Sequence, residues 1–564
     1  MSSIRILLIC LLLPVFTWGE DAVWPTLFRG RFRPSDASAR LWLEDLAHKT
    51  RIDDRSAETL LWDLHANGTA PYADVPLFAI QRAKLKEVLG LPAKQSRFSP
   101  TEIEKGLERT SFLSLLARYA FLEAYQSASN RGAARTFELS SLAPGLWVAL
   151  QGTDLMVLAV PKTAPWSRFQ EGDLLCRAVD PQEGIDKGTR DEAQQLQVKW
   201  RSFTQFNSAS SNLSLEQQGP HLLALPFRGE AGRWISLSAL RQNASNFTPY
   251  ADTDFTHIRN SYLKVIKALQ AGQDAAEERR ELGEALSTAY AGSLAGEVYQ
   301  TAAGNVLRYP SMGQLKAERA YYSYPFTTGA WILYALGLLL FALGFKMRRW
   351  AIGAALAAFL LHSTVLALRV YILGRPPVSN MYETLLYVPW ISVVLGGILY
   401  SRALLAASCA ASLGMLLLLQ LTHLDSGLEN VQAVLDSQYW LTVHVLMVVG
   451  SYGVFLLAAV LGHAQLFQMA RGKPGRGELN RLILHSLYVG TALLVTGTVL
   501  GGVWAAQSWG RFWDWDPKES WAFISSCAYL MGIHLYSFGQ IREKGLAVCA
   551  ALGFLVISFT WYGV

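Results

Sequence analysis

The chain has 564 residues, enough for two or more domains. Apolar residues make up 51% of the sequence and charged residues only 17%, which is typical of a membrane protein. The formal charge of +6, from 50 basic and 44 acidic residues, is too small an excess to indicate binding to nucleic acid. Most of the charge precedes Arg319 and most long apolar runs follow it, so we predict a soluble region followed by a membrane region.

The first residues have the pattern of an export signal. Arg5 supplies a positive start, residues 6–16 form an apolar core, and residues 17–19 offer a small-residue cleavage site. We predict a signal peptide at residues 1–19, with an uncleaved anchor as the alternative. Either way, the residues that follow are expected outside the cytoplasm.

Residues 20–322 are predicted to form an extracytoplasmic α+β domain. Cys176 is its only cysteine, so an internal disulfide is excluded there and a thiol–disulfide exchange role is disfavoured. The predicted elements are helices at 35–49 and 99–126, β-type runs at 147–160 and 222–240, and two helices within 255–300 that break near Gly272.

Residues 323–564 are predicted to form a polytopic α-helical membrane domain. A spanning helix needs about 20 apolar residues, and in lipid only helices and closed barrels satisfy their own backbone hydrogen bonds. We expect about eight transmembrane helices, at 326–345, 351–372, 384–401, 403–422, 440–469, 486–506, 520–540 and 545–562.

Basic residues between these segments predict the orientation. They follow every other segment, which places those loops together on the cytoplasmic side: Lys346, Arg348, Arg349, Arg402, Arg471, Lys473, Arg476, Arg481, Arg542 and Lys544. The loops at 374–383 and 504–521 are then external, on the same side as the soluble domain.

The external loop 504–521, called the Trp-rich loop below, is unusually aromatic. It interleaves indole and charged side chains: Trp504, Trp509, Trp513, Asp514, Trp515, Asp516, Lys518, Glu519 and Trp521. Wide, rigid rings at a membrane surface suit a large planar ligand, and haem is the first candidate, with Lys518 and Arg511 available for its propionates. An interfacial anchor belt is the alternative, although it does not explain the interleaved charges.

Four histidines lie within predicted membrane helices, where an ionisable group is costly and therefore a functional candidate. His444 lies near the external end of its helix, at the depth of the Trp-rich loop, and suits an axial iron ligand. His534 lies toward the cytoplasmic side, and His463 is expected at the cytoplasmic interface. For His362, seven residues before Arg369, we favour a structural role. A neutral, hydrogen-bonded histidine remains the alternative for each.

Several motifs resemble those of a known family. Residues 509–519 resemble its tryptophan-rich "WWD" signature, residues 374–383 its GRxPVSNxYE loop, residues 438–445 its external-histidine segment, and residues 521–534 the following helix. On these motifs, the C-terminal part resembles the CcsA-type (ResC-type) subunit of the System II cytochrome c synthase. Residues 30–40 also resemble a segment of the external domain of fused synthases.

The resemblance implies that the protein binds haem b in the membrane and presents it externally for attachment to the CxxCH thiols of apocytochrome c. It implies a role within a lyase-type ligase complex, with a CcsB/ResB-type membrane subunit and a thioredoxin-like thiol reductant as partners. His444 matches an external iron ligand and His534 a membrane-embedded one. The haem-platform positions are Trp509, Trp513, Trp515, Asp516, Lys518 and Glu519.

The sequence departs from the family pattern in two respects. The family has a second external histidine beyond the last helix, past the position of Val564, and His423 is the only local substitute. Fused synthases also carry CcsB-type helices that are not found here, so a separate partner is implied.

The sequence is also compatible with two other functions. The protein could be a cofactor-free membrane transporter, with His362, Arg369, His444 and His534 lining a polar path. It could also be an assembly scaffold whose soluble domain docks apocytochrome. A haem absorbance band would distinguish the haem-binding interpretation from these two alternatives.

Overall fold

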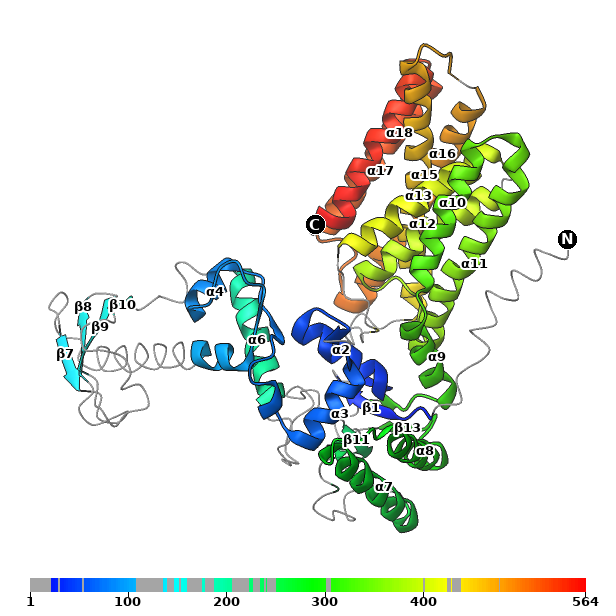
Figure 1. The fold of residues 1–564 in the computed structure, drawn as a ribbon. Helices are drawn as coiled ribbons and strands as arrows, with labels where there is room; N and C mark the ends of the chain where they lie inside the picture. The colour runs from blue at the N-terminus through cyan, green and yellow to red at the C-terminus, as the bar shows by residue number, and fades with distance from the viewer. Residues whose placement is uncertain are drawn as a thin grey trace. The chain divides into compact units, whose positions relative to one another are not determined.

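The computed structural model of the protein divides by its contacts into two units (Figure 1). We call residues 24–293 with 299–307 the N-terminal unit, and residues 294–298 with 308–564 the helical unit. The structure describes residues 22–28, 31–52, 55–107, 135–138, 147–151, 154–159, 175–177, 187–204, 223–226, 234–237, 240, 250–300, 306–398, 401–422, 428, 438–475 and 477–563. The predicted signal peptide and His423 lie outside these residues.

Helices of the N-terminal unit begin and end where local sequence directs. Ser56 caps one of them, because its hydroxyl oxygen accepts a hydrogen bond from the amide of Thr59 at 3.1 Å. Gly272, with φ +70°, provides the left-handed turn between the last two. The helices are α2 (Ser35–Ala47), α3 (Ala57–Asn67), α4 (Ala83–Leu89), α6 (Lys187–Thr204), α7 (Asp252–Gln270) and α8 (Ala276–Ser293).

The described strands pair antiparallel. Four form one sheet in the order β10–β9–β8–β7: β7 (Arg135–Glu138), β8 (Trp147–Gln151), β9 (Asp154–Ala159) and β10 (Leu175–Arg177). The others pair as β1 (Pro25–Phe28) with β2 (Arg31–Pro34), β3 (Arg51–Ile52) with β4 (Arg55–Ser56), β5 (Phe78–Ala79) with β6 (Arg97–Phe98), β11 (Leu223–Pro226) with β12 (Trp234–Ser236), and β13 (Val298–Gln300) with β14 (Val306–Arg308).

The predicted elements of this region are confirmed where they are described. The 35–49 helix is α2, the 147–160 run is β8 and β9, and the 222–240 run contains β11 and β12. The 255–300 region contains the two helices α7 and α8, which break at the glycine. Of the predicted 99–126 helix, residues 100–107 are helical and the remainder lies outside the described residues.

All eight predicted membrane segments are helical. They are α10 (Phe326–Ala342), α11 (Arg348–Leu373), α12 (Met381–Ile398), α13 (Arg402–Leu421), α15 (Leu446–Ala470), α16 (Gly477–Trp509), α17 (Pro517–Ser537) and α18 (Glu543–Ser558). The unit also contains the short elements α9 (Met312–Ser323), η5 (Phe345–Met347), α14 (Gln438–Trp440), η7 (Leu441–Val445) and η8 (Phe559–Gly563). η7 and η8 are π-helices.

Six helices of the described chain are long and apolar enough to cross a membrane by themselves, and a seventh span is possible because α9 and α10 join at a 52° bend. The six include α11, α12, α13 and α16, together with α15 and α18 extended by their π-helices. The 21-residue α17 is not among them, because Ser525, Ser526 and His534 interrupt its apolar run. The fold is therefore that of a polytopic helical membrane protein.

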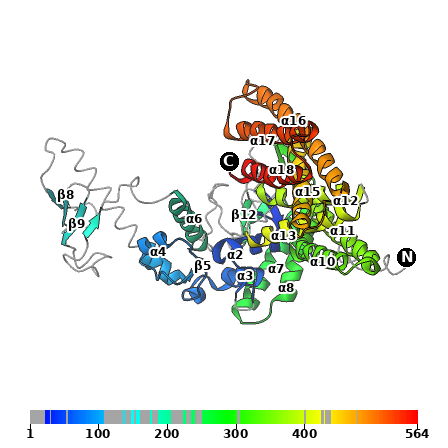
Figure 2. The same cartoon turned by 90° about the horizontal axis from the view of Figure 1, so that it is seen from above.

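α15 is the central helix of this unit. It packs against α16 on one side and against α12, α13 and α18 on others, and Figure 2 shows it between α18 and α12. Phe455 of α15 stacks on Tyr529 of α17 with ring centroids 3.7 Å apart. Gly490 of α16 permits this pair, since a Cβ there would lie 2.7 Å from the Phe455 ring.

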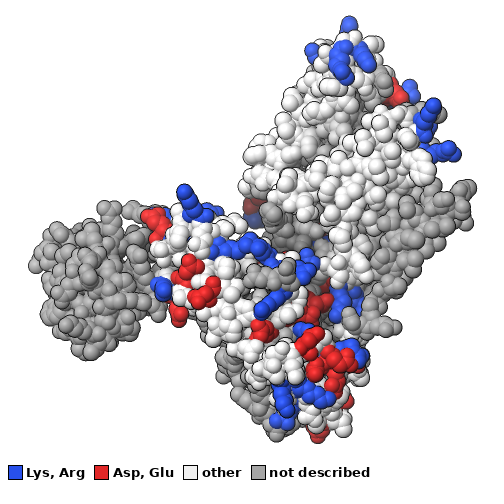
Figure 3. Space-filling view, viewed as in Figure 1, with Lys and Arg blue, Asp and Glu red and all other residues white. Residues whose placement is uncertain are grey.

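Charge is segregated within the helical unit. Its flank is almost free of charged side chains, and basic side chains gather at the end where α15 turns into α16 (Figure 3). The C-terminus and the start of α17 lie at the opposite end (Figure 1). Basic side chains therefore gather at one end of the bundle, and the start of α17 lies at the other end. This arrangement agrees with the alternation of basic loops along the sequence.

Candidate functional site

The structure shortens the predicted loop, because residues 504–509 form the end of α16 and residues 517–521 the start of α17. Only residues 510–516 connect the two helices, and the name Trp-rich loop is kept for 504–521. Gly510, with φ +73°, turns the chain out of the helix, and Trp515 also has a left-handed backbone, with φ +57°. A bulky residue in that region is uncommon and is held there only by its surroundings. The loop is therefore a defined turn between two helices.

Asp516 and Glu519 cap α17 in a reciprocal pair. The Asp516 carboxylate accepts from the Glu519 amide at 2.7 Å, and Glu519 Oε2 accepts from the amides of Asp514 and Asp516 at 2.8 and 3.4 Å. Pro517 occupies the first helical position, where its missing N–H costs nothing. The two acidic residues predicted as haem-platform positions thus shape the loop.

The tryptophans of the loop form two groups. Trp504 and Trp509 lie with ring centroids 6.2 Å apart. Trp513 and Trp515 lie 5.8 Å apart and nearly perpendicular, and Trp515 also contacts Phe523 edge-on at 6.3 Å. The rings within each pair are tilted or perpendicular, so the four indoles do not form one flat surface.

Two indole rings of the Trp-rich loop are exposed. Trp509 is 51% exposed and Trp515 68% exposed, beside Phe512 at 49%. Trp513 is partly buried, and its indole Nε1 has no hydrogen-bond acceptor among the described residues. A buried N–H without an acceptor is rare in proteins, so this donor suits a ligand oxygen.

His444 lies at the base of this loop, in the π-helix η7 that precedes α15. Its Nδ1 donates to the carbonyl oxygen of Gly497 in α16 at 2.7 Å, and its ring lies 5.9 Å from that of Trp504. Trp440 steadies the same region, because its Nε1 donates to Gln507 Oε1 at 3.0 Å. π-helical turns often occur at functional sites, where they displace a side chain from its regular position.

Lys518 is placed differently from the prediction that it meets a propionate. Its Nζ donates to the carbonyl oxygens of Thr560 and Trp561, at 3.1 and 3.2 Å. Arg511 pairs with Asp514 inside the loop. Both cations that were expected to face a ligand are thus engaged with the protein.

The last turn of the chain is fastened to the start of α17 and α12. The Thr560 hydroxyl lies 2.8 Å from that of Ser525, and Trp561 Nε1 donates to Thr384 Oγ1 at 3.1 Å. Trp521 packs on Phe559 with ring centroids 4.4 Å apart. The loop, the end of α18 and the start of α12 therefore form one connected structure.

The 374–383 loop is organised by Glu383, which is fully buried. Its carboxylate accepts from Arg369 Nε and Nη2 at 3.2 and 3.0 Å, and from the amide and hydroxyl of Ser379 at 2.8 and 2.7 Å. Arg375 lies 3.5 Å from the same carboxylate. Arg369 also donates to the Tyr321 hydroxyl at 2.6 Å, which ties α9 to the loop. These residues hold the ends of α9, α11 and α12 together.

The other predicted histidines have distinct environments. His362 is fully buried, with Nε2 2.9 Å from the Leu386 carbonyl oxygen, in agreement with the structural role favoured for it. His463 is exposed, and its Nδ1 lies 2.8 Å from the carbonyl oxygen of Ala459 on its own helix.

His534 is exposed on the outer face of α17, with Nδ1 2.7 Å from the Leu530 carbonyl. Its neighbours on this helix are exposed and apolar, among them Met531, Leu535 and Phe538. The structure does not bring His534 together with His444, because one belongs to η7 and the other to the far part of α17.

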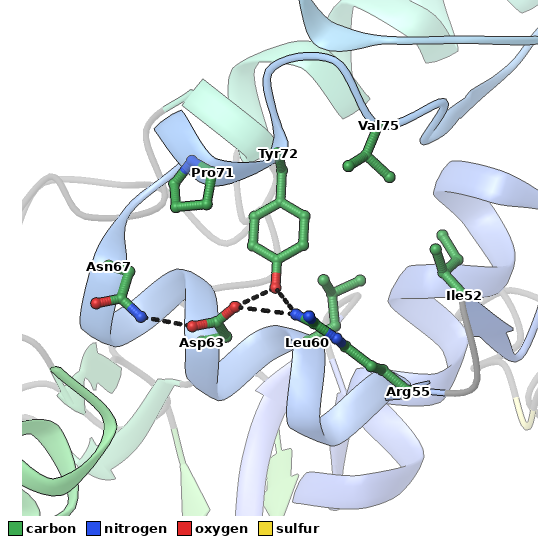
Figure 4. Close-up of a pocket in the computed structure, with 8 residues that line it drawn as sticks. All are labelled: Ile52, Arg55, Leu60, Asp63, Asn67, Pro71, Tyr72 and Val75. Atoms are coloured by element: carbon green, nitrogen blue, oxygen red, sulfur yellow. Dashed lines mark hydrogen bonds and ion pairs between the residues drawn. The ribbon is translucent and has the colours of Figure 1, made fainter. Parts of the chain in front are cut away.

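A small cavity of about 280 Å³ lies in the N-terminal unit (Figure 4). Arg55 Nη1 bonds to Tyr72 and Asp63 at 3.1 and 3.5 Å, and Asn67 donates to Asp63 at 2.6 Å. Tyr72 also donates to Asp63. The cavity falls below the ~300–1,000 Å³ of typical small-molecule sites, so it does not suit a porphyrin.

The partners of His444 were not predicted from the sequence. Gly497 and Gly501, one helical turn apart, are the small residues that let a neighbouring segment approach α16. Their i, i+4 spacing was a detectable signal, but only the fold reveals which histidine they face.

The fold and this end of the bundle define a polytopic membrane protein with a histidine beside an aromatic loop. A family model described as cytochrome C assembly protein matches residues 378–564. The chain is 30% identical over 243 residues to the cytochrome c biogenesis protein CcsA of Prochlorococcus marinus (strain MIT 9301), covering 36% of this chain and 78% of that protein. The chain belongs to this family, and its role lies in cytochrome c biogenesis.

Two further relatives agree. The chain is 36% identical over 296 residues to Protein NrfI of Wolinella succinogenes, covering 47% of this chain but only 32% of NrfI. It is 28% identical over 208 residues to CcsA of Chlamydomonas reinhardtii, covering 34% of this chain and 58% of that protein. The chain thus spans about a third of the length of NrfI.

Proposed function

We propose that the protein holds haem at the external end of the helical unit and presents it for attachment to apocytochrome c. His444 would ligate the iron through Nε2, and Trp509, Trp513 and Trp515 would flank the ring. The single observation that carries this proposal is the 2.7 Å bond from His444 Nδ1 to the Gly497 carbonyl. This bond occupies one ring nitrogen, and Nε2 has no hydrogen-bond partner among the described residues.

The chemistry of the donor set fits haem. A neutral imidazole with one bonded nitrogen is a common iron ligand, and exposed indoles offer flat apolar area for a macrocycle. The unpaired Nε1 of Trp513 is a donor for a propionate oxygen. Lys518 and Arg511 contribute by holding the loop rather than by meeting the ligand.

The protein's contribution to the reaction would be orientation. The thiols of a CxxCH motif add across the haem vinyl groups, with each thiol sulfur bonding to one vinyl carbon and its hydrogen going to the other. That addition needs reduced thiols and a fixed haem, and it needs no protein nucleophile. Holding two reactants in one geometry supplies a large rate factor. A thioredoxin-like reductant and haem b as the transferred group complete this proposal.

His534 suggests an earlier position of haem in the membrane. An imidazole exposed at membrane depth is costly unless a polar partner meets it. We propose that α17 faces a CcsB/ResB-type subunit there, and that His534 ligates haem before it reaches His444. The helical unit would lie in a bacterial cytoplasmic membrane, with its basic loops inside and residues 20–322, following a signal peptide, outside.

The test is the absorbance of full-length protein purified from haem-replete cells. We expect a Soret band that His444→Ala removes or strongly reduces. The matched control is His463→Ala, because that exposed histidine lies near the opposite end of α15. A colourless wild-type protein, or a band unchanged in His444→Ala, would contradict the proposed function.

A further inference from the structure

The surroundings of His444 are unusually close on one side. A Cβ atom added to Gly501 would lie 2.6 Å from the Cε1 of His444, and 3.1 and 3.2 Å from its two ring nitrogens. Real Cβ atoms do not approach so closely. The imidazole therefore lies directly against the backbone of α16, in space that any side chain at position 501 would fill.

Gly497 contributes in two ways. Its carbonyl oxygen accepts the bond from His444 Nδ1 at 2.7 Å. A Cβ atom on Gly497 would lie 2.6 Å from Val448 Cγ2 and 3.2 Å from the Val448 amide nitrogen, so the absence of a side chain also lets the start of α15 approach α16. Both contacts hold η7 and α15 at one distance from α16.

This geometry selects one tautomer of the imidazole. A neutral histidine carries a single N–H, and a carbonyl oxygen can only accept a hydrogen bond. The proton therefore lies on Nδ1, and the lone pair lies on Nε2. An acceptor bonded to the nitrogen that does not bind the metal fixes the tautomer and ring orientation of a metal-binding histidine.

We infer that Gly497 and Gly501 are positioning residues for haem: they hold His444 as the Nδ1–H tautomer and present Nε2 to the iron. This inference rests on the proposed function. A carbonyl acceptor also withdraws the Nδ1 proton less than a carboxylate would, so the ligand stays neutral and favours ferrous iron. Reduced iron is the state that thioether formation requires.

The first experiment compares two glycine-to-alanine changes within the same bundle. Gly501→Ala should weaken haem binding by about 10- to 100-fold, the usual effect of disturbing residues that orient a metal ligand, and should shift the haem reduction potential. Gly414→Ala in α13 is the matched control, since its Cβ would meet nothing within 4 Å. Unchanged affinity and potential in Gly501→Ala would overturn the inference.

A change at His444 itself distinguishes the role of the two glycines from haem binding as such. His444→Gly removes the ligand itself, and added imidazole should restore the Soret band in its place. If this variant loses haem while Gly501→Ala behaves as wild type, the glycines do not position the ligand and the function stands. If His444→Gly keeps haem unaltered, both are overturned.

A second measurement needs no glycine variant and no haem. Nitrogen-15 NMR of the haem-free, histidine-labelled full-length protein should contain a neutral Nδ1–H signal that disappears in His444→Gln. An Nε2–H signal lost in that variant would overturn the inference even if Gly501→Ala failed to fold.

Discussion

Lys518 and Thr560, 42 residues apart in the chain, are joined directly, with Nζ 3.1 Å from the carbonyl oxygen. Lys518 also reaches the next carbonyl, that of Trp561, at 3.2 Å. Both carbonyls belong to the π-helix η8, and the ammonium that donates to them belongs to the second residue of α17. The Trp-rich loop is therefore fixed by the end of the following hairpin as well as by its own caps.

Replacing Lys518 should loosen this connection. In Lys518→Met we expect faster amide exchange at residues 510–520 and at 559–563, because two carbonyls lose their donor. The cost should be only about 1 kcal/mol, since the side chain is partly solvated. Hydrogen exchange with mass spectrometry measures both segments.

Lys544→Met is the matched control, because that exposed lysine begins α18 at the opposite end of the helix. Lys518→Arg should preserve part of the protection. Equal exchange in Lys518→Met and wild type would show that the contact holds nothing in place.

The buried pair of Arg369 and Glu383 should be sensitive to loss of either partner. Glu383→Gln leaves two guanidinium groups, those of Arg369 and Arg375, without the carboxylate that both approach. Breaking a buried pair typically costs about 3–5 kcal/mol. We expect thermal denaturation of Glu383→Gln at a clearly lower temperature than wild type.

Arg369→Met should be less harmful than Glu383→Gln, because Arg375 still neutralises the carboxylate. An exposed pair, Glu277 with Arg280, supplies the comparison, and Glu277→Gln should leave the transition nearly unchanged. If Arg369→Met denatured at a lower temperature than Glu383→Gln, Glu383 would not be pairing with both cations.

The exposed indole of Trp515 should matter for haem and little for stability. At 68% exposure it packs weakly, so Trp515→Ala should leave the melting temperature within a degree or two while reducing the Soret band. Trp513→Ala should reduce the band as well, with some loss of stability.

Trp350→Ala is the control for a general membrane-surface effect, since that tryptophan is 65% exposed at the start of α11. If all three variants keep the same haem content, the tryptophans are interfacial anchors.

Ionisation of Tyr72 should reduce the stability of the N-terminal unit at alkaline pH. Burial, together with the hydrogen bond to the Asp63 carboxylate, raises the pKa of Tyr72 well above its ordinary value. The unfolded chain loses this proton near pH 10, whereas the folded unit retains it. Stability from this group is thus complete below about pH 10 and falls as the pH rises further.

Pulse proteolysis of the full-length protein between pH 8.5 and 11 measures that decline. Tyr72→Phe should be less stable at pH 8.5, by about 1 kcal/mol for the lost hydrogen bonds, and should show a smaller decline above pH 10. An equally steep decline in both proteins would place its origin elsewhere.

Much of the fold was predictable because local sequence decides it. Apolar length predicted eight membrane segments, all of which are helical, and glycine predicted the break between α7 and α8. The Trp-rich loop and His444 were also predictable as neighbours, because alternating basic loops imply one shared end of the bundle. For the helices and the glycine break, the information lies within a few residues of the feature, whereas for the loop and His444 it comes from the charge pattern along the whole membrane region.

The roles of individual side chains at the site were decided by tertiary structure. Lys518 and Glu519 read as charges available to a ligand, yet one donates to carbonyls 42 residues away and the other caps its own helix. The tautomer of His444 depends on the carbonyl of Gly497, 53 residues further along the chain. Sequence determined which chemical groups reach the end of the bundle that carries the Trp-rich loop. Only the packing of α15 against α16 decided which of these groups form hydrogen bonds within the protein. A hydrogen bond depends on distance in space and not on separation along the chain.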